Sequence, residues 1–159
     1  MTYGPKGKAT NLIVARFRDG RVMKGHTFSL TPDSRTFYLN SADDAAHQQM
    51  IHLQDLKAVF FVNSLEGDPS REKVIPEKVN PKPGERLIII RFDDGEIVVG
   101  STLSFSYDRL GFFITPLDPT GNAWRVFVVK DAVAELRLLK SPLDLPQAIR
   151  ELRAAAGEG

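Results

Sequence analysis

Apolar and polar residues alternate in short runs along most of the chain, and these runs occur twice in the same order. Two β-prone runs, residues 12–18 and 87–93, are each followed by an aspartate and a glycine, in Asp19-Gly20 and Asp94-Gly95. An Asp-Gly pair between apolar runs is typical of a β-hairpin with a type I′ turn, which needs positive φ at both central residues. The pattern therefore predicts one such hairpin at the start of each half.

The two halves align without a gap from residue 11 to residue 53 when the chain is shifted by 75 positions. Gly25 and Gly100 then match, each inside the second strand of its hairpin. A glycine inside a strand weakens the pairing and usually marks a bulge or a bend. We expect both strands to bend at these glycines, with backbone angles that are costly for other residues.

Each half is predicted to contain five strands. In the first half these are residues 12–18, 21–30, 36–40, 50–53 and 57–62, and in the second half 86–93, 96–105, 111–115, 124–129 and 133–139. Five short strands with a bent second strand are typical of a small SH3-like barrel, and a closed barrel leaves no free strand edge. We predict an all-β fold of two tandem five-stranded SH3-like barrels, at residues 11–65 and 86–140, plus a short C-terminal helix.

Three segments flank these units. Residues 1–10 are predicted to be a flexible tail, and residues 66–85, with four prolines, an extended linker. Residues 141–159 are predicted to hold a helix and a tail, with Asp144 as a candidate N-cap. Its apolar face would consist of Leu145, Ala148, Ile149 and Leu152. We expect the helix to close an open barrel end; the alternative is a helix that docks on a partner.

The Asp-Gly turn followed five residues later by glycine, present in both halves, resembles the first motif of Sm-like proteins. This resemblance implies a bent five-stranded barrel that binds RNA, usually as a ring. The RNA-contacting asparagine of that family stands four residues after an aspartate in the next turn. Here Phe37 and Phe112 occupy that position, and we interpret both as core residues.

A larger part of the chain resembles an uncharacterised bacterial family whose members carry this tandem pair alone or appended to signalling proteins. The resemblance covers most of residues 11–140 and rests on residues 56–62, 66–69, 111–113 and 125–129. That family has no assigned activity. The resemblance therefore implies the fold and a bacterial setting.

Composition excludes several classes of chemistry. The chain has no cysteine, which excludes disulfides, thiolate catalysis and cysteine-based zinc sites. Lys plus Arg number 21 and Asp plus Glu 20, so the net charge attracts neither nucleic acid nor acidic lipid. No apolar run approaches the roughly 20 residues of a membrane span, and the N-terminus lacks the apolar core of a signal peptide. We expect a cytoplasmic protein without membrane association.

No set of residues with catalytic or metal-binding chemistry recurs in both halves. His47 and His52 lie near Asp43 and Asp44, and imidazole and carboxylate are ligands that transition metals use. The matching positions of the second half, however, are Asn122 and Phe127. We predict no catalytic residue, no metal site and no cofactor.

Two groups of residues are candidates for binding. Basic side chains gather on the first hairpin, at Arg16, Arg18, Arg21 and Lys24, whereas the second hairpin carries Asp93, Asp94 and Glu96. These cations are either a solvated strand face or a patch that binds phosphate or an acidic partner. Among the aromatic residues, Tyr38 or Phe113 is expected at an interface between the barrels. A ligand surface made by Phe105, Tyr107 and Trp124 is the alternative.

The function that we expect from these features is that of a non-enzymatic binding or adaptor module with a protein partner, in bacterial signalling or regulation. Small barrels lack a deep cleft and commonly bind peptides or strands at their edges. The alternative is an Sm-like protein that binds RNA or single-stranded nucleic acid through basic and stacking side chains. The sequence leaves the oligomeric state open.

Overall fold

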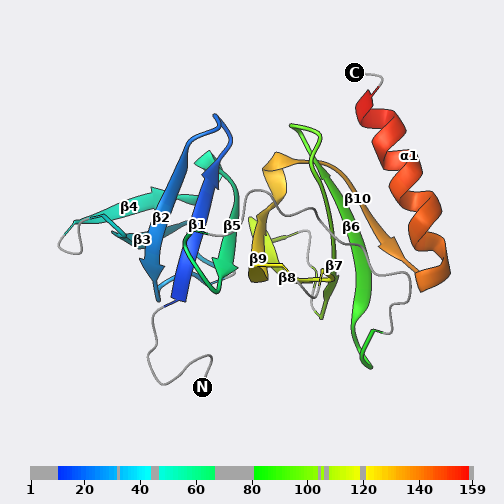
Figure 1. Ribbon diagram of the computed structural model, residues 1–159, viewed down its shortest axis with the longest axis horizontal. Helices are drawn as coiled ribbons and strands as arrows, with labels where there is room; N and C mark the ends of the chain where they lie inside the picture. The colour runs from blue at the N-terminus through cyan, green and yellow to red at the C-terminus, as the bar shows by residue number, and fades with distance from the viewer. Residues whose placement is uncertain are drawn as a thin grey trace.

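The computed structural model describes residues 11–31, 33–43, 47–66, 81–103, 105, 108–118 and 121–157. Within them the chain forms one antiparallel β-sheet and one α-helix, α1 (Leu145–Gly157) (Figure 1). The strands are β1 (Asn11–Phe17), β2 (Val22–Thr27), β3 (Thr36–Ser41), β4 (Gln48–His52), β5 (Leu56–Val62), β6 (Arg86–Phe92), β7 (Ile97–Thr102), β8 (Gly111–Pro116), β9 (Ala123–Val129) and β10 (Val133–Leu139). The all-β class and the C-terminal helix are thus confirmed. The expected tail, residues 1–10, and residues 67–80 of the expected linker lie outside the described residues.

All ten strands belong to a single sheet in the order β10-β6-β7-β8-β9-β5-β1-β2-β3-β4. Both halves therefore have the same internal order, with the fifth strand beside the first. The halves join where β5 pairs with β9, from Ala58 opposite Val128 to Val62 opposite Ala123. We call this pairing the β5–β9 seam. Two closed barrels are not confirmed, because the described sheet is continuous through the seam and open at β4 and β10.

The gapless alignment of the halves holds only as far as the third strand. Phe37 lies opposite Ile51 in the first half, whereas its counterpart Phe112 lies opposite Val128 in the second. The second half therefore has two more residues between its third and fourth strands. As a result Met50, and not His52, is the counterpart of Phe127, and the expected match of His52 is wrong.

The hairpin turns differ from the expected type I′. Gly20 and Gly95 have φ of 97° and 93°, but no described residue other than glycine has a positive φ, which excludes the required geometry at Asp19 and Asp94. The Gly20 N–H donates to the Phe17 carbonyl at 3.1 Å. Each turn is a loop that ends in a left-handed glycine, the usual geometry of three-residue hairpin loops.

Gly25 and Gly100 lie where the second and third strands of each half approach closely. A Cβ atom at Gly25 would lie 2.0 Å from the Asn40 carbonyl oxygen, and one at Gly100 would lie 2.7 Å from that of Thr115. Neither glycine has a positive φ, so the expectation of costly backbone angles is wrong. What the fold requires at both positions is the absence of a side chain.

The seam strands contribute to the cores of both halves. Val59 and Phe61 of β5 and Phe127 of β9 lie in the core of the first half. Ala58 of β5 lies instead in the core of the second half, together with Val126 and Val128 of β9. Because side chains alternate along a strand, each seam strand packs into both cores, and neither core is complete without the other half.

The helix α1 covers the outer side of the second half. Its predicted apolar face, formed by Leu145, Ala148, Ile149 and Leu152, is confirmed: it packs on Ile89 and Val99. Ile88 and Ile90 point to the opposite side, into the core, so β6 is buried on both faces. The helix therefore covers a sheet face instead of closing a barrel end as expected. No helix in the described part of the chain is long and apolar enough to cross a membrane.

Candidate binding surfaces

Three of the four basic residues on the first hairpin are engaged within the protein. The Arg16 guanidinium lies over the Phe60 ring at 5.7 Å, and that of Arg21 lies over the Phe17 ring at 4.4 Å. Arg21 Nε also lies 2.8 Å from Asp19 Oδ2, and Arg18 Nη2 lies 3.5 Å from Asp93 Oδ2. Lys24 is exposed on β2. The hairpin is therefore not a free cationic patch.

Cations of the first half pair with the acidic second hairpin and hold the halves together, as Arg18 does with Asp93. Lys57 Nζ of β5 lies 2.7 Å from Asp94 Oδ2 and also pairs with Glu96 of the second hairpin. The Lys57 side chain is only 11% exposed and its ammonium lies over the Phe92 ring at 4.8 Å. Such a partly buried pair is less screened by salt than one in open solvent. The charge difference seen in the sequence thus serves the contact between the halves.

The Lys57 pairs predict an acid-dependent loss of stability. Burial raises the pKa of Asp94, but the hydrogen bonds from Lys57 and from the Glu96 N–H outweigh it, and the net pKa lies below the ordinary value of 3.8. A depressed folded-state pKa stabilises the protein above the unfolded-state pKa, and this contribution is lost as the pH falls through the folded-state pKa. Lys57→Met should be less stable than the parent protein at neutral pH.

Urea unfolding of both proteins between about pH 6 and pH 2.5 tests this expectation, because the loss of the Asp94 charge falls in that window. The difference in unfolding free energy should shrink as the pH falls. A difference that stays constant with pH would mean that the ion pairs at Lys57 contribute no net stability.

A groove of about 400 Å³ opens in the second half between β7 and β8. These strands pair only at Gly100–Pro116 and Ser101–Thr115, and beyond these pairs they diverge. We call this opening the β7–β8 groove. Its lining combines apolar, hydroxyl and charged side chains, among them Leu30, Thr31, Glu85, Leu103, Arg109, Phe113, Thr115 and Arg125. Leu30 and Thr31 come from the first half, so both halves contribute to it.

Two guanidinium groups and one carboxylate, Glu85, which accepts the Ser101 hydroxyl, set the electrostatics of the groove. The Arg125 guanidinium lies over the Phe113 ring at 3.7 Å, and partial burial lowers the pKa of Arg125 from its ordinary value. No acidic side chain in the described part of the chain forms an ion pair with it. Arg109 Nε lies 3.5 Å from Asp33 Oδ1, in an exposed pair of a kind that contributes little. The groove can therefore accept an anionic group.

A second surface lies at the other end of the sheet. Tyr38 of β3 and Met50 of β4 lie opposite each other and are 49% and 47% exposed. Their counterparts, Phe113 and Phe127, also lie opposite each other. Phe127 is fully buried in the first-half core, and the Phe113 ring lies 5.9 Å from that of Phe61 on β5. The same pair of positions thus packs at the seam in one half, with Phe127 buried and Phe113 partly buried, and is exposed in the other.

Residues 8–140 match the family of unknown function DUF6982. The chain belongs to the DUF6982 family. The match includes all ten strands, and α1 follows it. No curated protein and no solved structure matches the chain. The function of this DUF6982 protein must therefore be inferred from its own surfaces.

The remaining predicted aromatic residues of the DUF6982 protein do not form one ligand surface in the described part of the chain. Trp124 is 41% exposed and packs edge-on against Phe61 at 5.7 Å, beside the seam. Phe105 packs against Phe112 at 4.8 Å, and Tyr107 lies outside the described residues. Of the expected interface residues, Phe113 packs at the contact between the halves and Tyr38 does not.

Several candidate binding residues were missed by the sequence interpretation. Met50 could have been found only by knowing the two-residue insertion that makes it the counterpart of Phe127. Arg125 stands in a continuous strand pattern and carries no signal of its own. The histidines belong to no metal site in the part of the chain that the structure describes, where no group of three or more metal-ligating side chains gathers; Asp44 lies outside it.

Proposed function

We propose that this protein is a non-enzymatic adaptor module of bacterial signalling or regulation that binds a protein partner in the β7–β8 groove. The observation that carries the proposal is Arg125, an exposed guanidinium that stacks on Phe113 and has no acidic partner among the described residues, at the side of a groove lined by both apolar and polar side chains. A complementary ligand is an extended peptide that presents apolar side chains and one carboxylate.

The geometry of Arg125 favours a carboxylate. Stacking on Phe113 holds the planar guanidinium in place, so less side-chain entropy is lost when it forms a two-pronged pair with a carboxylate. Leu30 and Leu103 offer apolar contact on the walls. The groove volume of about 400 Å³ lies within the range of known ligand sites.

The hydroxyl groups of the groove support binding and not catalysis. Thr102 Oγ1 donates to the Phe113 carbonyl at 3.1 Å, and Ser101 Oγ donates to Glu85 Oε2 at 3.3 Å. A nucleophile needs an adjacent base that accepts its proton and a third group that orients that base. The described lining contains no histidine or lysine, and its one carboxylate, Glu85, is a much weaker base than either, so we propose no catalytic role for these hydroxyls.

We further infer that each half is a unit of the SH3-like and Sm-like kind. The support is the strand order, in which the fifth strand lies beside the first in both halves, and the glycine needed in each second strand. Binding of single-stranded RNA, as the resemblance to Sm-like proteins implies, is the second candidate function. It rests on exposed Trp124 beside Arg125, because bases stack on aromatic and guanidinium planes.

Arg125→Glu tests the proposed function. We expect peptides selected by the parent protein from a random 12-residue array to contain an acidic side chain among apolar ones. The variant should bind them at least about tenfold more weakly, measured by fluorescence anisotropy, since charge-assisted hydrogen bonds contribute on this scale. Arg153→Glu, the same charge change on an exposed helix position, is the matched control and should leave the affinity unchanged.

Two outcomes would contradict the peptide proposal. If both charge reversals weaken binding equally, the effect is one of net charge and the groove is not the site. If the array selects no peptide but a uridine-rich oligonucleotide binds with a steep dependence on salt, the RNA function replaces the proposed one.

A further inference from the structure

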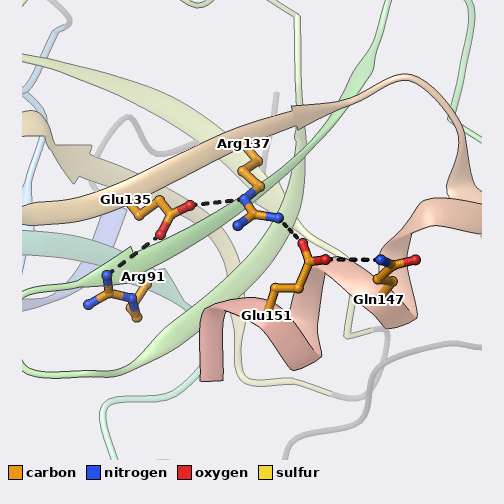
Figure 2. A network of polar contacts seen from close by, with 5 residues as sticks. All are labelled: Arg91, Glu135, Arg137, Gln147 and Glu151. Carbon is orange, nitrogen blue, oxygen red and sulfur yellow. Dashed lines mark hydrogen bonds and ion pairs between the residues drawn. The ribbon is translucent and has the colours of Figure 1, made fainter. Parts of the chain in front are cut away.

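The two ends of the sheet are built differently. At one end, β10 carries Glu135 and Arg137 in a charged network that reaches α1 (Figure 2). Glu135 contacts Arg91 at 3.7 Å and Arg137 at 3.0 Å, and Arg137 contacts Glu151 at 2.5 Å. Figure 1 places α1 beside this end of the molecule. Charged side chains on an edge strand are one of the devices by which proteins protect a sheet edge from pairing with another chain.

At the opposite end, β4 has none of these devices among the described residues. The strand reads Gln48-Gln49-Met50-Ile51-His52 and contains neither a charged residue nor a proline. Among the described strands, its backbone pairs with β3 alone. Tyr38 and Met50 are exposed next to this free edge. An uncharged strand edge beside exposed apolar side chains is a template for the addition of a further strand.

The protein already contains one example of a strand that pairs with the outer edge of the fourth strand of a half. The counterpart of β4 is β9, and its outer edge is covered by β5 at the seam. There Phe113 and Phe127, the counterparts of Tyr38 and Met50, pack in the first-half core. The fourth strand of each half thus presents its edge and one apolar pair to an incoming strand. In the second half the same chain supplies that strand, β5, whereas no described strand of the chain covers the edge of β4.

We propose that two copies of this chain form a dimer through their β4 edges. The described sheet has two edges, β4 and β10. Because β10 is protected, the edge that can pair with β4 of one copy is β4 of the other copy. A two-fold axis brings the two β4 strands together in antiparallel orientation. This pairing continues the sheet, because all its strand pairs are antiparallel. Such an interface is self-complementary and closes at two copies. An axis near Met50 places the Met50 side chains of the two copies side by side, with each Tyr38 on the next strand inward.

The dimer does not depend on the proposed function, since no residue of β4 lines the β7–β8 groove. It would place two grooves on one particle. Two linked sites raise the apparent affinity for a partner that carries two binding segments. A dimer and a groove ligand are therefore tested by separate variants.

Sedimentation velocity of the full chain between about 1 and 100 µM tests the dimer, because interfaces of this kind have dissociation constants around the micromolar range. The parent protein should sediment with the mass of two chains at the upper concentrations. Met50→Lys should sediment as a monomer, since the two ammonium groups would face each other across the axis. Leu143→Lys, at an apolar position 88% exposed far from β4, should remain dimeric.

Cross-linking keeps the test independent of how the lysine variants fold. The chain has no cysteine, so Met50→Cys introduces a single thiol, and oxidation should yield a covalent dimer. Leu143→Cys should not. A parent protein that stays monomeric at about 100 µM, a mass that grows beyond two chains, or equal cross-linking of both cysteine variants would overturn the proposal. Unchanged peptide binding by the Met50→Lys monomer would leave the proposed function standing.

Discussion

Replacing Phe127 by alanine is expected to destabilise the whole protein by about 3–5 kcal/mol, the usual cost of truncating a buried phenylalanine. Phe127 is fully buried and its ring lies 5.0 Å from that of Phe113. It belongs to β9 of the second half, but it packs in the core of the first half. The cavity left by alanine should therefore weaken both halves together.

Urea unfolding followed by far-UV circular dichroism and by the fluorescence of Trp124, the single tryptophan, measures this effect. Both signals should show one shared transition that moves to lower urea in Phe127→Ala. The matched control is Phe28→Ala, at a position that is 64% exposed, and it should change stability by no more than about 0.5 kcal/mol. Two separate transitions, of which only one moves, would show that the halves fold independently.

Replacing Gly25 by alanine is the second change with a large expected effect, about 2–4 kcal/mol of destabilisation. The new Cβ would lie 2.0 Å from the Asn40 carbonyl oxygen and 3.2 Å from the Leu39 side chain. The backbone of β3 must then move away from β2. At other positions with negative φ, replacing glycine by alanine usually stabilises a protein, because the unfolded chain loses conformational freedom. A destabilising effect at Gly25 would therefore be specific to this close contact.

The series of glycines provides the controls for this prediction. Gly100→Ala should cost less than Gly25→Ala, since its Cβ would lie 2.7 Å from the Thr115 oxygen. Gly121→Ala, with its closest contact at 3.4 Å, should change stability by no more than about 0.5 kcal/mol. Thermal unfolding of the three variants measures the order, and equal effects at Gly25 and Gly121 would contradict the close strand approach.

The repeat allowed most of the local structure to be predicted. The strands and the apolar face of α1 lie where hydrophobic periodicity places them, because both depend on residues close in sequence. The turn type was wrong, since the Asp19 carboxylate accepts the Arg21 N–H at 3.0 Å and the glycine alone takes the left-handed conformation. The pairing of β5 with β9 was also missed, because it joins distant segments.

One signal for the seam was nevertheless present in the sequence. Residues 58–62 and 126–129 are apolar without alternation, as in strands covered on both faces. The binding surfaces gave weaker signals. The cations of the first hairpin were found, but the partner of Arg18, Asp93, lies in the other half. Lys57 of β5, which pairs with Asp94 and Glu96, was missed. The β7–β8 groove arises from the divergence of two strands, which no local pattern encodes.

The two halves form one sheet with shared cores, and hydrogen exchange of the backbone amides tests this shared architecture most directly. If the cores are shared, the paired amides of β5 and β9 exchange only when the whole protein unfolds, so their opening free energy equals the global value. The cores of both halves should share that value. Opening free energies of the two halves that differ by more than about 2 kcal/mol, with early exchange at the seam, would contradict it.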